Sequence, residues 1–336
     1  MMRVPIHELK QMLEQVLLQV GFTPERARAC ARLFAETDRD GVYSHGLNRF
    51  PRFLDYIRLG HVRVQAEPEK VSGLGGLEVW DGHLGPGNLN AEAAMARAIA
   101  LAQQQGIGAV ALRNTNHWMR GGSYGWQAAE AGCVGICFTN TIPNMPPWGG
   151  KTPALGNNPL IMAVPRSDGR HVVLDMAMSQ FSYGKLEVMG AAGKKLPVPG
   201  GYDSSGNLTN EARDIMETGR VLPVGFWKGA GLSLVLDLLA SILSGGKPAV
   251  DIGAQGAEYG VCQVFICLQP QLSSAADQVE KVIQRALTFV KSSQQVNARS
   301  EILYPGEMVL RTRLENLEAG IPVNEEVWQQ LLRGEL

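Results

Sequence analysis

The first sixty residues carry a helical pattern of apolar positions. Over residues 5–20 apolar side chains recur every three or four positions, which predicts an amphipathic helix. Thr23 and Pro24 predict the start of a second helix that continues to about residue 35. Ser44 has the character of a helix cap, so we expect a third helix over residues 45–59, in which Pro51 predicts a kink or a late start. The chain therefore opens with a helical block.

Beyond residue 70, short apolar runs of strand type alternate with longer helical patterns. The expected strands are residues 109–112, 134–138, 160–164, 171–175 and 261–268. The expected helices are residues 88–105, 123–131, 181–190, 226–243 (a buried, strongly apolar one), 273–291, 307–318 and 324–332. This alternation predicts the α/β class. Residues 141–159 are rich in Pro, Gly and Asn without periodicity, and a loop of that length is usually functional or disordered.

The length of 336 residues suits one large or two intertwined domains. We expect three parts along the chain. Residues 1–60 form the helical block, residues 61–120 with 240–336 a substrate and dimerisation domain, and residues 121–239 a cofactor-binding domain.

Composition excludes several classes of protein. With 31 basic and 32 acidic residues the net charge is −1, which predicts no nucleic-acid or membrane partner. None of the five cysteines forms a CxxC pair, and the odd number favours a reducing compartment. The sequence shows no secretory signal and no run of 18 apolar residues, so we expect a cytoplasmic protein. No group of His, Asp and Glu has metal-ligand spacing, and no metal is predicted.

The usual nucleotide-binding motifs are missing. Gly106-Ile107-Gly108 follows a helix and opens a strand, the reverse of the order that a dinucleotide fingerprint requires. The segment 226–231 (Phe-Trp-Lys-Gly-Ala-Gly) precedes a long apolar helix, where Trp227 and Lys228 could help to seat a phosphate. A glycine-rich turn with an exposed lysine explains this segment equally well.

Two histidines stand in settings that suit catalysis. If Ser44 caps a helix, His45 and Arg49 lie four residues apart on one face, and the helix dipole keeps His45 neutral. Arg49 could then hold a substrate carboxylate beside His45, which would exchange a proton. His117 follows an expected strand, close to Asn116 and Arg120, and could serve as acid or base. Taken in isolation, each pattern is explained at least as well without catalysis: His45 could be a surface residue, and His117 a loop residue that hydrogen-bonds to the backbone.

Three long segments resemble the malate/L-lactate dehydrogenase family, which lacks the Rossmann fold. They are residues 41–53 (Gly-Val-Tyr-Ser-His-Gly through Phe-Pro-Arg-Phe), residues 112–130 around Asn116-His117-Trp118, and Gly156-Asn157-Asn158-Pro159-Leu160. Residues 145–149, 181–184 and 225–229 resemble the family member that reduces 2,3-diketo-L-gulonate. The resemblance covers nearly the whole chain and implies an NAD(P)-binding α/β fold of the family's own type (L-sulfolactate dehydrogenase-like), with an N-terminal helical block, in a homodimer.

The resemblance also implies an activity and its residues. The activity is reduction of the 2-keto group of a 2-keto sugar acid, 2,3-diketo-L-gulonate, with NADH preferred and NADPH as the other candidate cofactor. His45 is the implied proton donor, and His117 takes that role in sister dehydrogenases, with Arg49 on the carboxylate. The expected substrate contacts are Ser44, Asn48, Arg52, Asn116 and Arg120. The expected cofactor contacts are His171, Val172, Val173, Leu174, Asp175, Met176, Ala177, Trp227, Lys228, Gly306, Glu307 and Met308.

Two points of the pattern stay open. The last turn reads Gly306-Glu307-Met308, where the diketogulonate-reducing member has Gly-His-Glu. The alternatives are another activity of the family, such as malate, L-lactate or ureidoglycolate dehydrogenase, or a non-catalytic protein that binds NAD or a metabolite on this scaffold.

Overall fold

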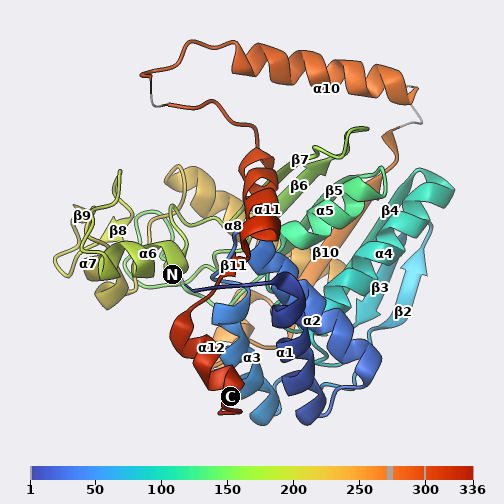
Figure 1. The fold of residues 1–336 in the computed structure, drawn as a ribbon, viewed down its shortest axis with the longest axis horizontal. Helices are drawn as coiled ribbons and strands as arrows, with labels where there is room; N and C mark the ends of the chain where they lie inside the picture. The colour runs from blue at the N-terminus through green and yellow to red at the C-terminus, as the bar shows by residue number, and fades with distance from the viewer. Residues whose placement is uncertain (1, 271–274, 299, 336) are drawn as a thin grey trace.

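A seven-stranded mixed sheet forms the centre of the computed structural model, which describes residues 2–270, 275–298 and 300–335 (Figure 1). The strand order is β2-β3-β4-β10-β5-β6-β7. The strands are β2 (Glu69–Leu74), β3 (Leu77–Asp81), β4 (Ile107–Thr115), β5 (Val134–Thr139), β6 (Leu160–Val164), β7 (Val172–Met176) and β10 (Val261–Leu268). Strand β10 lies antiparallel between β4 and β5, and only β3 and β4 pair in parallel. The α/β class is confirmed.

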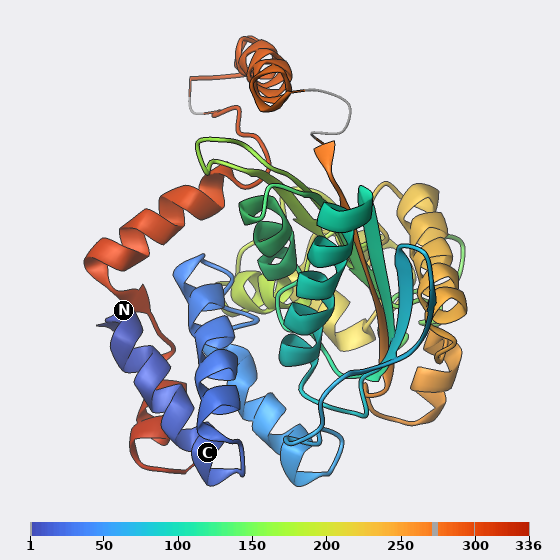
Figure 2. The same ribbon diagram turned by 90° about the vertical axis from the view of Figure 1, so that its right-hand side faces the viewer.

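Helices cover both faces of this sheet, as Figure 2 shows. Helices α4 (Gly87–Gln105) and α5 (Gly122–Glu130) pack one face through small side chains such as Ala94, Ala98 and Ala128. Helices α6 (Tyr183–Ala191), α7 (Ala212–Thr218) and α8 (Trp227–Ser244) lie on the other, with α9 (Ala249–Ala254) beside them. Two short strands, β8 (Gly201–Tyr202) and β9 (Leu208–Thr209), pair between α6 and α7.

The N-terminal helices form a second core of their own. Helices α1 (Ile6–Gln19), α2 (Pro24–Arg39) and α3 (Phe50–Arg58) bury side chains such as Leu13, Phe34 and Phe53 together. The end of the chain returns to this block, because β1 (Arg3–Val4) pairs with β11 (Ile321–Pro322). Helices α11 (Glu307–Ala319) and α12 (Glu325–Leu332) also contact it. Both ends of the chain therefore lie on the helical block.

Most of the expected elements are present, with ends shifted by a few residues. Helix α2 runs four residues further than expected, and Thr23 caps it by accepting a hydrogen bond from the N–H of Arg26 at 3.4 Å. The hairpin of β2 and β3 was not expected, because glycines interrupt its apolar pattern. The division into three domains stays a prediction; strands from both of its later parts share the one sheet.

The expected third helix is wrong at its start. Residues 42–46 form turns, a short 3-10 helix spans Leu47–Arg49, and α3 begins only at Phe50. Pro51 therefore marks a late start, since proline fits the first turn of a helix and not its interior. Ser44 is not a helix cap, and His45 and Arg49 do not share a helical face.

Helix α8 is also not fully buried as expected. Five apolar side chains on its outer face are 41–73% exposed: Leu234, Val235, Leu238, Leu239 and Ile242. By length and apolar composition α8 is the one described helix that could cross a membrane. However, its Ser233, Leu236, Asp237 and Ala240 pack under the sheet, as in the core helix of a soluble protein.

Helix α10 (Ala276–Lys291) lies outside the layers of the sheet and its covering helices (Figures 1 and 2), and the ion pairs Glu280–Arg166 and Lys291–Glu307 join it to them. None of its residues is buried, and Val282 and Phe289 are 67% and 79% exposed. Part of the helix expected over residues 273–291 lies outside the described residues.

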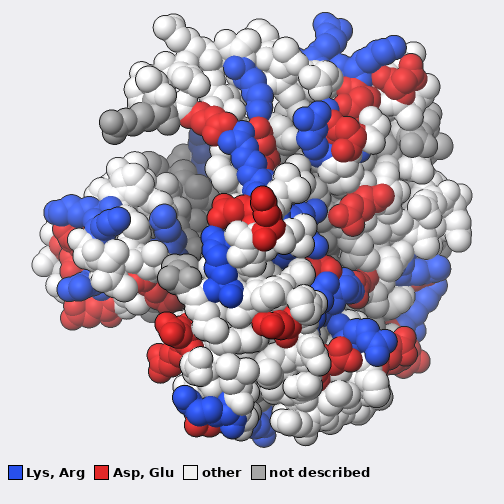
Figure 3. All heavy atoms as spheres, in the orientation of Figure 1, with Lys and Arg blue, Asp and Glu red and all other residues white. Residues whose placement is uncertain are grey.

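Charges of both signs are mixed over the face of the molecule seen in Figure 3, in keeping with the net charge of −1.

Candidate active site

A cavity of about 600 Å³ lies between the helical block and the sheet, within the usual size range of ligand sites. Four separate segments line most of it: residues 42–45, 117–121, 139–159 and 173–177, and the turn at 303–306 adds a further wall. A smaller cavity of about 20 Å³ adjoins it, and His117, Met119 and Glu258 line both. The long loop at 141–159 is thus part of the larger cavity.

His45 and His117 meet at this cavity although 71 residues separate them in sequence. Their rings are stacked with centroids 5.8 Å apart and an angle of 22° between the planes. Nδ1 of His117 accepts the N–H of Met119 at 3.0 Å, so the proton of the neutral ring sits on Nε2. Nδ1 of His45 lies 2.8 Å from Oγ of Ser44. The fold therefore brings both predicted histidines together.

Both histidines are uncharged at neutral pH. Burial, with the positive charges of Arg49 and Arg120, lowers the pKa of His45 to about 4. Burial and the charge of Arg49 also hold the pKa of His117 well below its usual range. The expected neutral state of His45 thus arises from burial and neighbouring cations, and not from a helix dipole.

Asp38 shapes the turn that carries His45. One carboxyl oxygen of Asp38 accepts the N–H of Leu47 at 2.6 Å, inside the block. Gly46 packs directly on this carboxyl, and a Cβ at position 46 would lie about 2.1 Å from it. Burial raises the pKa of Asp38. A glycine is therefore required beside His45, and the sequence pattern alone did not single out Asp38.

Arg49 and Arg52 line the smaller cavity beside His117. Arg49 is half-buried, and within the described part of the chain its guanidinium forms no ion pair. Burial lowers the pKa of Arg49, although the group remains charged. Arg52 donates a hydrogen bond to Oη of Tyr56 at 3.3 Å. A buried cation without an anionic partner is costly, so this position suits a substrate carboxylate.

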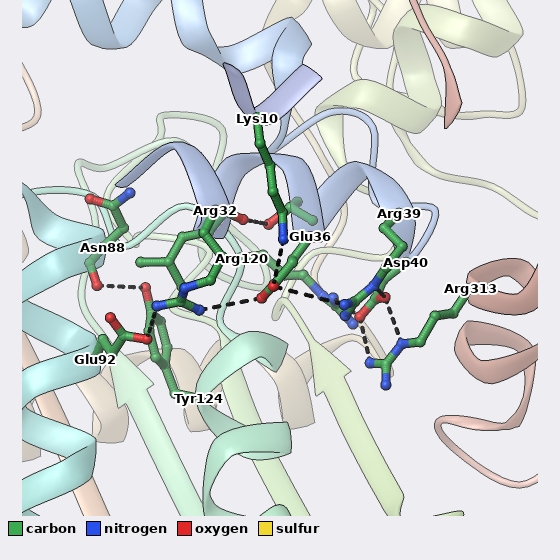
Figure 4. Close-up of polar contacts among 12 residues, drawn as sticks. Lys10, Arg32, Glu36, Arg39, Asp40, Asn88, Glu92, Arg120, Tyr124 and Arg313 are labelled. Atoms are coloured by element: carbon green, nitrogen blue, oxygen red, sulfur yellow. Dashed lines mark hydrogen bonds and ion pairs between the residues drawn. The ribbon is translucent and has the colours of Figure 1, made fainter. Parts of the chain in front are cut away.

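Asp40 holds three arginines from three parts of the chain (Figure 4). Its carboxylate accepts Nη1 of Arg120 at 2.6 Å, Nε and Nη2 of Arg313 at 2.8 and 2.7 Å, and Nε of Arg39 at 2.7 Å. These bonds and charges outweigh burial and keep the pKa of Asp40 well below its usual range. Arg120 lines the larger cavity, but one end of its guanidinium is engaged by Asp40. The network thereby joins the end of α2, the turn at Arg120 and helix α11 to one another beside the cavity.

We expect Asp40→Ala to lower the free energy of unfolding by about 3–5 kcal/mol, because it leaves buried arginines unpaired. Urea unfolding followed by circular dichroism measures this change. Asp55→Ala is the matched control, since Asp55 pairs with Arg58 on the surface and should contribute less than about 1 kcal/mol. An equal effect of the two variants would show that the Asp40 network is not a stabilising core.

Comparison with known proteins decides the family. The family model described as malate/L-lactate dehydrogenase matches residues 4–332. The chain belongs to the malate/L-lactate dehydrogenase family. It is 48% identical over 332 residues to the 2,3-diketo-L-gulonate reductase of Citrobacter koseri, covering 98% of this chain and 99% of the relative.

Solved structures agree with this assignment. The malate dehydrogenase of Pyrococcus horikoshii superimposes with a TM-score of 0.89 at 31% identity, covering 99% of this chain and 94% of that one. The sulfolactate dehydrogenase of Methanocaldococcus jannaschii gives 0.87 at 29% identity, covering 98% and 95%. The resemblance and the fold of the family's own type are confirmed, and the protein is an oxidoreductase acting on CH–OH groups.

A nicotinamide cofactor follows from this family, and the larger cavity fits one. Trp126 lines the cavity, and its Nε1 is buried without a hydrogen-bond partner among the described residues. Gly306 has φ +98°, and a Cβ there would lie 3.1 Å from the O of His171 and from the N of Val173. The turn therefore lies flat against β7. A flat aromatic wall, a free donor and a close backbone turn suit an aromatic nucleotide.

The expected cofactor residues divide into two groups. Val173, Leu174, Asp175, Ala177 and Gly306 line the larger cavity. The others lie outside its lining: His171, Val172, Met176, Trp227, Lys228, Glu307 and Met308. Trp227 is 66% exposed at the start of α8, Nδ1 of His171 accepts the N–H of Arg166 at 2.9 Å, and Glu307 pairs with Lys291 and Arg311. All twelve remain predictions for the cofactor site of this family member.

The expected substrate residues also differ in placement. Ser44 and Arg120 line the larger cavity, and Arg52 and Asn116 line the smaller. The amide nitrogen of Asn116 lies 2.9–3.0 Å from the carbonyl oxygens of His61, Leu84 and Gly85, which share its two N–H donors, so it braces three stretches of backbone. Asn48 is exposed and lines neither cavity.

Sequence reasoning missed several residues of the cavity wall: Trp126, Thr139, Asn140, Thr141, Asn157, Glu258 and Tyr304. A signal existed for part of them, because the aperiodic loop pointed to residues 141–159. For Glu258 there was none, since a single glutamate beside a glycine-rich turn looks like any surface residue.

Proposed function

We propose that the protein reduces the C2 carbonyl of 2,3-diketo-L-gulonate to give 3-keto-L-gulonate, with NADH as the preferred cofactor. The observation that carries the proposal is the stacked pair of His45 and His117 on one cavity, with Arg49 adjoining it. The 48% identity to a 2,3-diketo-L-gulonate reductase over the whole chain supports this substrate above other 2-keto acids.

The side chains of the site suggest a separate role in the reaction for each residue. A reduced nicotinamide, when bound, supplies the hydride. Arg49, with Arg52 nearby, binds the substrate carboxylate and so fixes the orientation of the carbonyl. His45 donates a proton to the carbonyl oxygen as negative charge develops there, and Ser44 holds the ring of His45 at Nδ1. Nε2–H of His117 donates a hydrogen bond to the same oxygen.

Binding of the substrate carboxylate should be coupled to proton uptake. Burial, with the charge of Arg49, keeps the pKa of His45 at about 4 in the free enzyme, and a bound carboxylate offsets the charge of Arg49. The pKa of His45 then rises, so uptake should grow as the pH falls from mildly alkaline to mildly acidic. Calorimetry with the unreactive analogue oxamate in buffers of different ionisation enthalpy measures it. His45→Asn should abolish the uptake; unchanged uptake in this variant would contradict the assignment.

An assay panel tests the proposed function. The rate of NADH and NADPH oxidation is measured with 2,3-diketo-L-gulonate, oxaloacetate, pyruvate and oxidised ureidoglycolate. The expected result is the highest kcat/KM with 2,3-diketo-L-gulonate and NADH. A higher value with another acid would assign another activity of the family, and cofactor binding without turnover would favour a non-catalytic role.

The exposed apolar surfaces support a homodimer. Five apolar residues of α8, with Val250 of α9 beside them, form a patch on one side of the molecule, and monomers rarely leave such patches in water. Light scattering on the protein as it leaves a size-exclusion column should give twice the mass of one chain. Ile242→Glu should shift it toward the monomer, whereas Leu74→Glu, in the exposed β2–β3 hairpin, should not. A monomeric wild-type protein would exclude the dimer.

We also propose a cytoplasmic location. The packing of α8 under the sheet and the buried free cysteines support it, because a reducing compartment keeps thiols unpaired.

A further inference from the structure

Glu258 is a carboxylate inside the site that the mechanism above does not use. It lies between α9 and β10, is only 7% exposed, and lines both cavities together with His117. Its Oε2 accepts the N–H of Ile142 at 3.1 Å, and its own N–H donates to Oη of Tyr56 at 3.3 Å. The side chain of Glu258 is thus tied to Ile142, and its backbone to Tyr56.

The second carboxylate oxygen of Glu258 has no hydrogen-bond partner among the described residues. The charge of Glu258 acts on both Arg49 and Arg52, yet neither arginine forms an ion pair with it in the described part of the chain. This oxygen is not among the enclosed polar atoms of the described residues, so it is accessible. Its position on the wall of both cavities means that a ligand can supply a hydrogen-bond donor to it.

Arg49 lines the smaller cavity, His45 lines the larger one, and Glu258 lines both. A keto acid that reaches from Arg49 to His45 therefore lies along the wall that carries Glu258. An ionised carboxylate accepts strong hydrogen bonds from hydroxyl groups. It repels a second anionic group on the same ligand, since like charges brought together are unfavourable.

We propose that Glu258 sets the substrate class of this enzyme: it favours 2-keto acids whose chain carries hydroxyl groups and rejects those with a second anionic group. The proposal rests on the proposed function. It would separate this chain from structural neighbours named as malate and sulfolactate dehydrogenases, whose substrates carry a second carboxylate or a sulfonate.

The test compares ratios of kcat/KM in wild type and in Glu258→Gln, which keeps the size and an acceptor for Ile142 but removes the charge. Pyruvate, with neither hydroxyls nor a second charge, is the reference. Relative to pyruvate, we expect 2,3-diketo-L-gulonate to lose roughly tenfold, the difference between a charged and a neutral acceptor. Oxaloacetate should gain by a similar factor, because the repulsion is removed.

Two further variants sharpen the result. Glu258→Asp keeps the charge but withdraws it by one methylene, so it should keep the rejection of oxaloacetate and lose preference for the hydroxylated substrate. Glu187→Gln is the matched control: Glu187 is exposed on α6 and also acts on the charge of Arg49, but it lines neither cavity. Its ratios should not change.

Equal loss with all three acids in Glu258→Gln would mean that Glu258 only positions the arginines, and the proposal would be wrong. A wild-type enzyme that prefers oxaloacetate would overturn it as well. Calorimetric binding of L-gulonate, L-malate and L-lactate gives the same ratios without turnover. If diketogulonate is not reduced but these binding ratios shift as expected, the proposed function fails and the selectivity of Glu258 stands.

Discussion

His45→Ala should lose roughly 10²–10⁴-fold in kcat, the usual contribution of a general acid. The physical reason is the position of His45 on the cavity, stacked on His117 and held at Nδ1 by Ser44. Without this ring no side chain at that position can donate a proton to the developing alkoxide. Steady-state kinetics at saturating substrate measure the loss, and circular dichroism verifies that the variant is folded.

The partner histidine decides how this result is interpreted. His117→Ala removes a hydrogen-bond donor and should cost less in kcat than His45→Ala. His7→Ala, an exposed residue on α1, is the control and should behave as wild type. If His117→Ala loses most of its activity and His45→Ala is nearly normal, the roles of the two histidines are exchanged.

Arg49→Ala should reduce kcat/KM by roughly thirtyfold to a thousandfold, the usual loss when one partner of a buried charge pair is truncated. Arg49→Lys should lose roughly tenfold, with a raised KM and a lower kcat, since an ammonium forms one of the two parallel bonds. Both follow from the half-buried guanidinium on the smaller cavity, which has no ion pair among the described residues.

Arg58→Lys serves as the control for Arg49. It lies on the same helix as Arg52, is exposed, and pairs with Asp55 at 3.1 Å. Its kinetics should match the wild type. Unchanged kinetics in both Arg49 variants would remove this residue from the substrate site.

Local pattern was sufficient for most helices and strands. Their period of apolar positions is a property of neighbouring residues, so α1, α4, β5 and β10 could be predicted within a few positions. It was not sufficient for the segment around His45. There Asp38 binds Leu47 and packs on Gly46, and this contact replaces the first turn of the expected helix with turns. The sequence analysis therefore expected His45 to be uncharged, as it is, but the helix dipole that it gave as the reason is not the cause.

The exposed face of α8 is a second feature that the local sequence pattern did not predict. Its composition predicted a buried helix, because apolar residues usually face a core. The sheet covers only one side of α8, and the remaining apolar residues lie at the surface. The elements that pack beside a helix decide which of its faces is buried, and the sequence of the helix alone does not identify those elements.

The sequence by itself determined the α/β class, the family and a nicotinamide cofactor, since each rests on short periods or on continuous segments. It also named two histidines and an arginine as candidates for the site, which remain predictions. Only the tertiary structure decided that His45 and His117 stack, that Asp40 joins arginines 80 and 273 positions away, and that Glu258 lines both cavities. The physical reason is that charge, burial and hydrogen bonding are set by neighbours in space, and in this fold those neighbours come from distant parts of the chain.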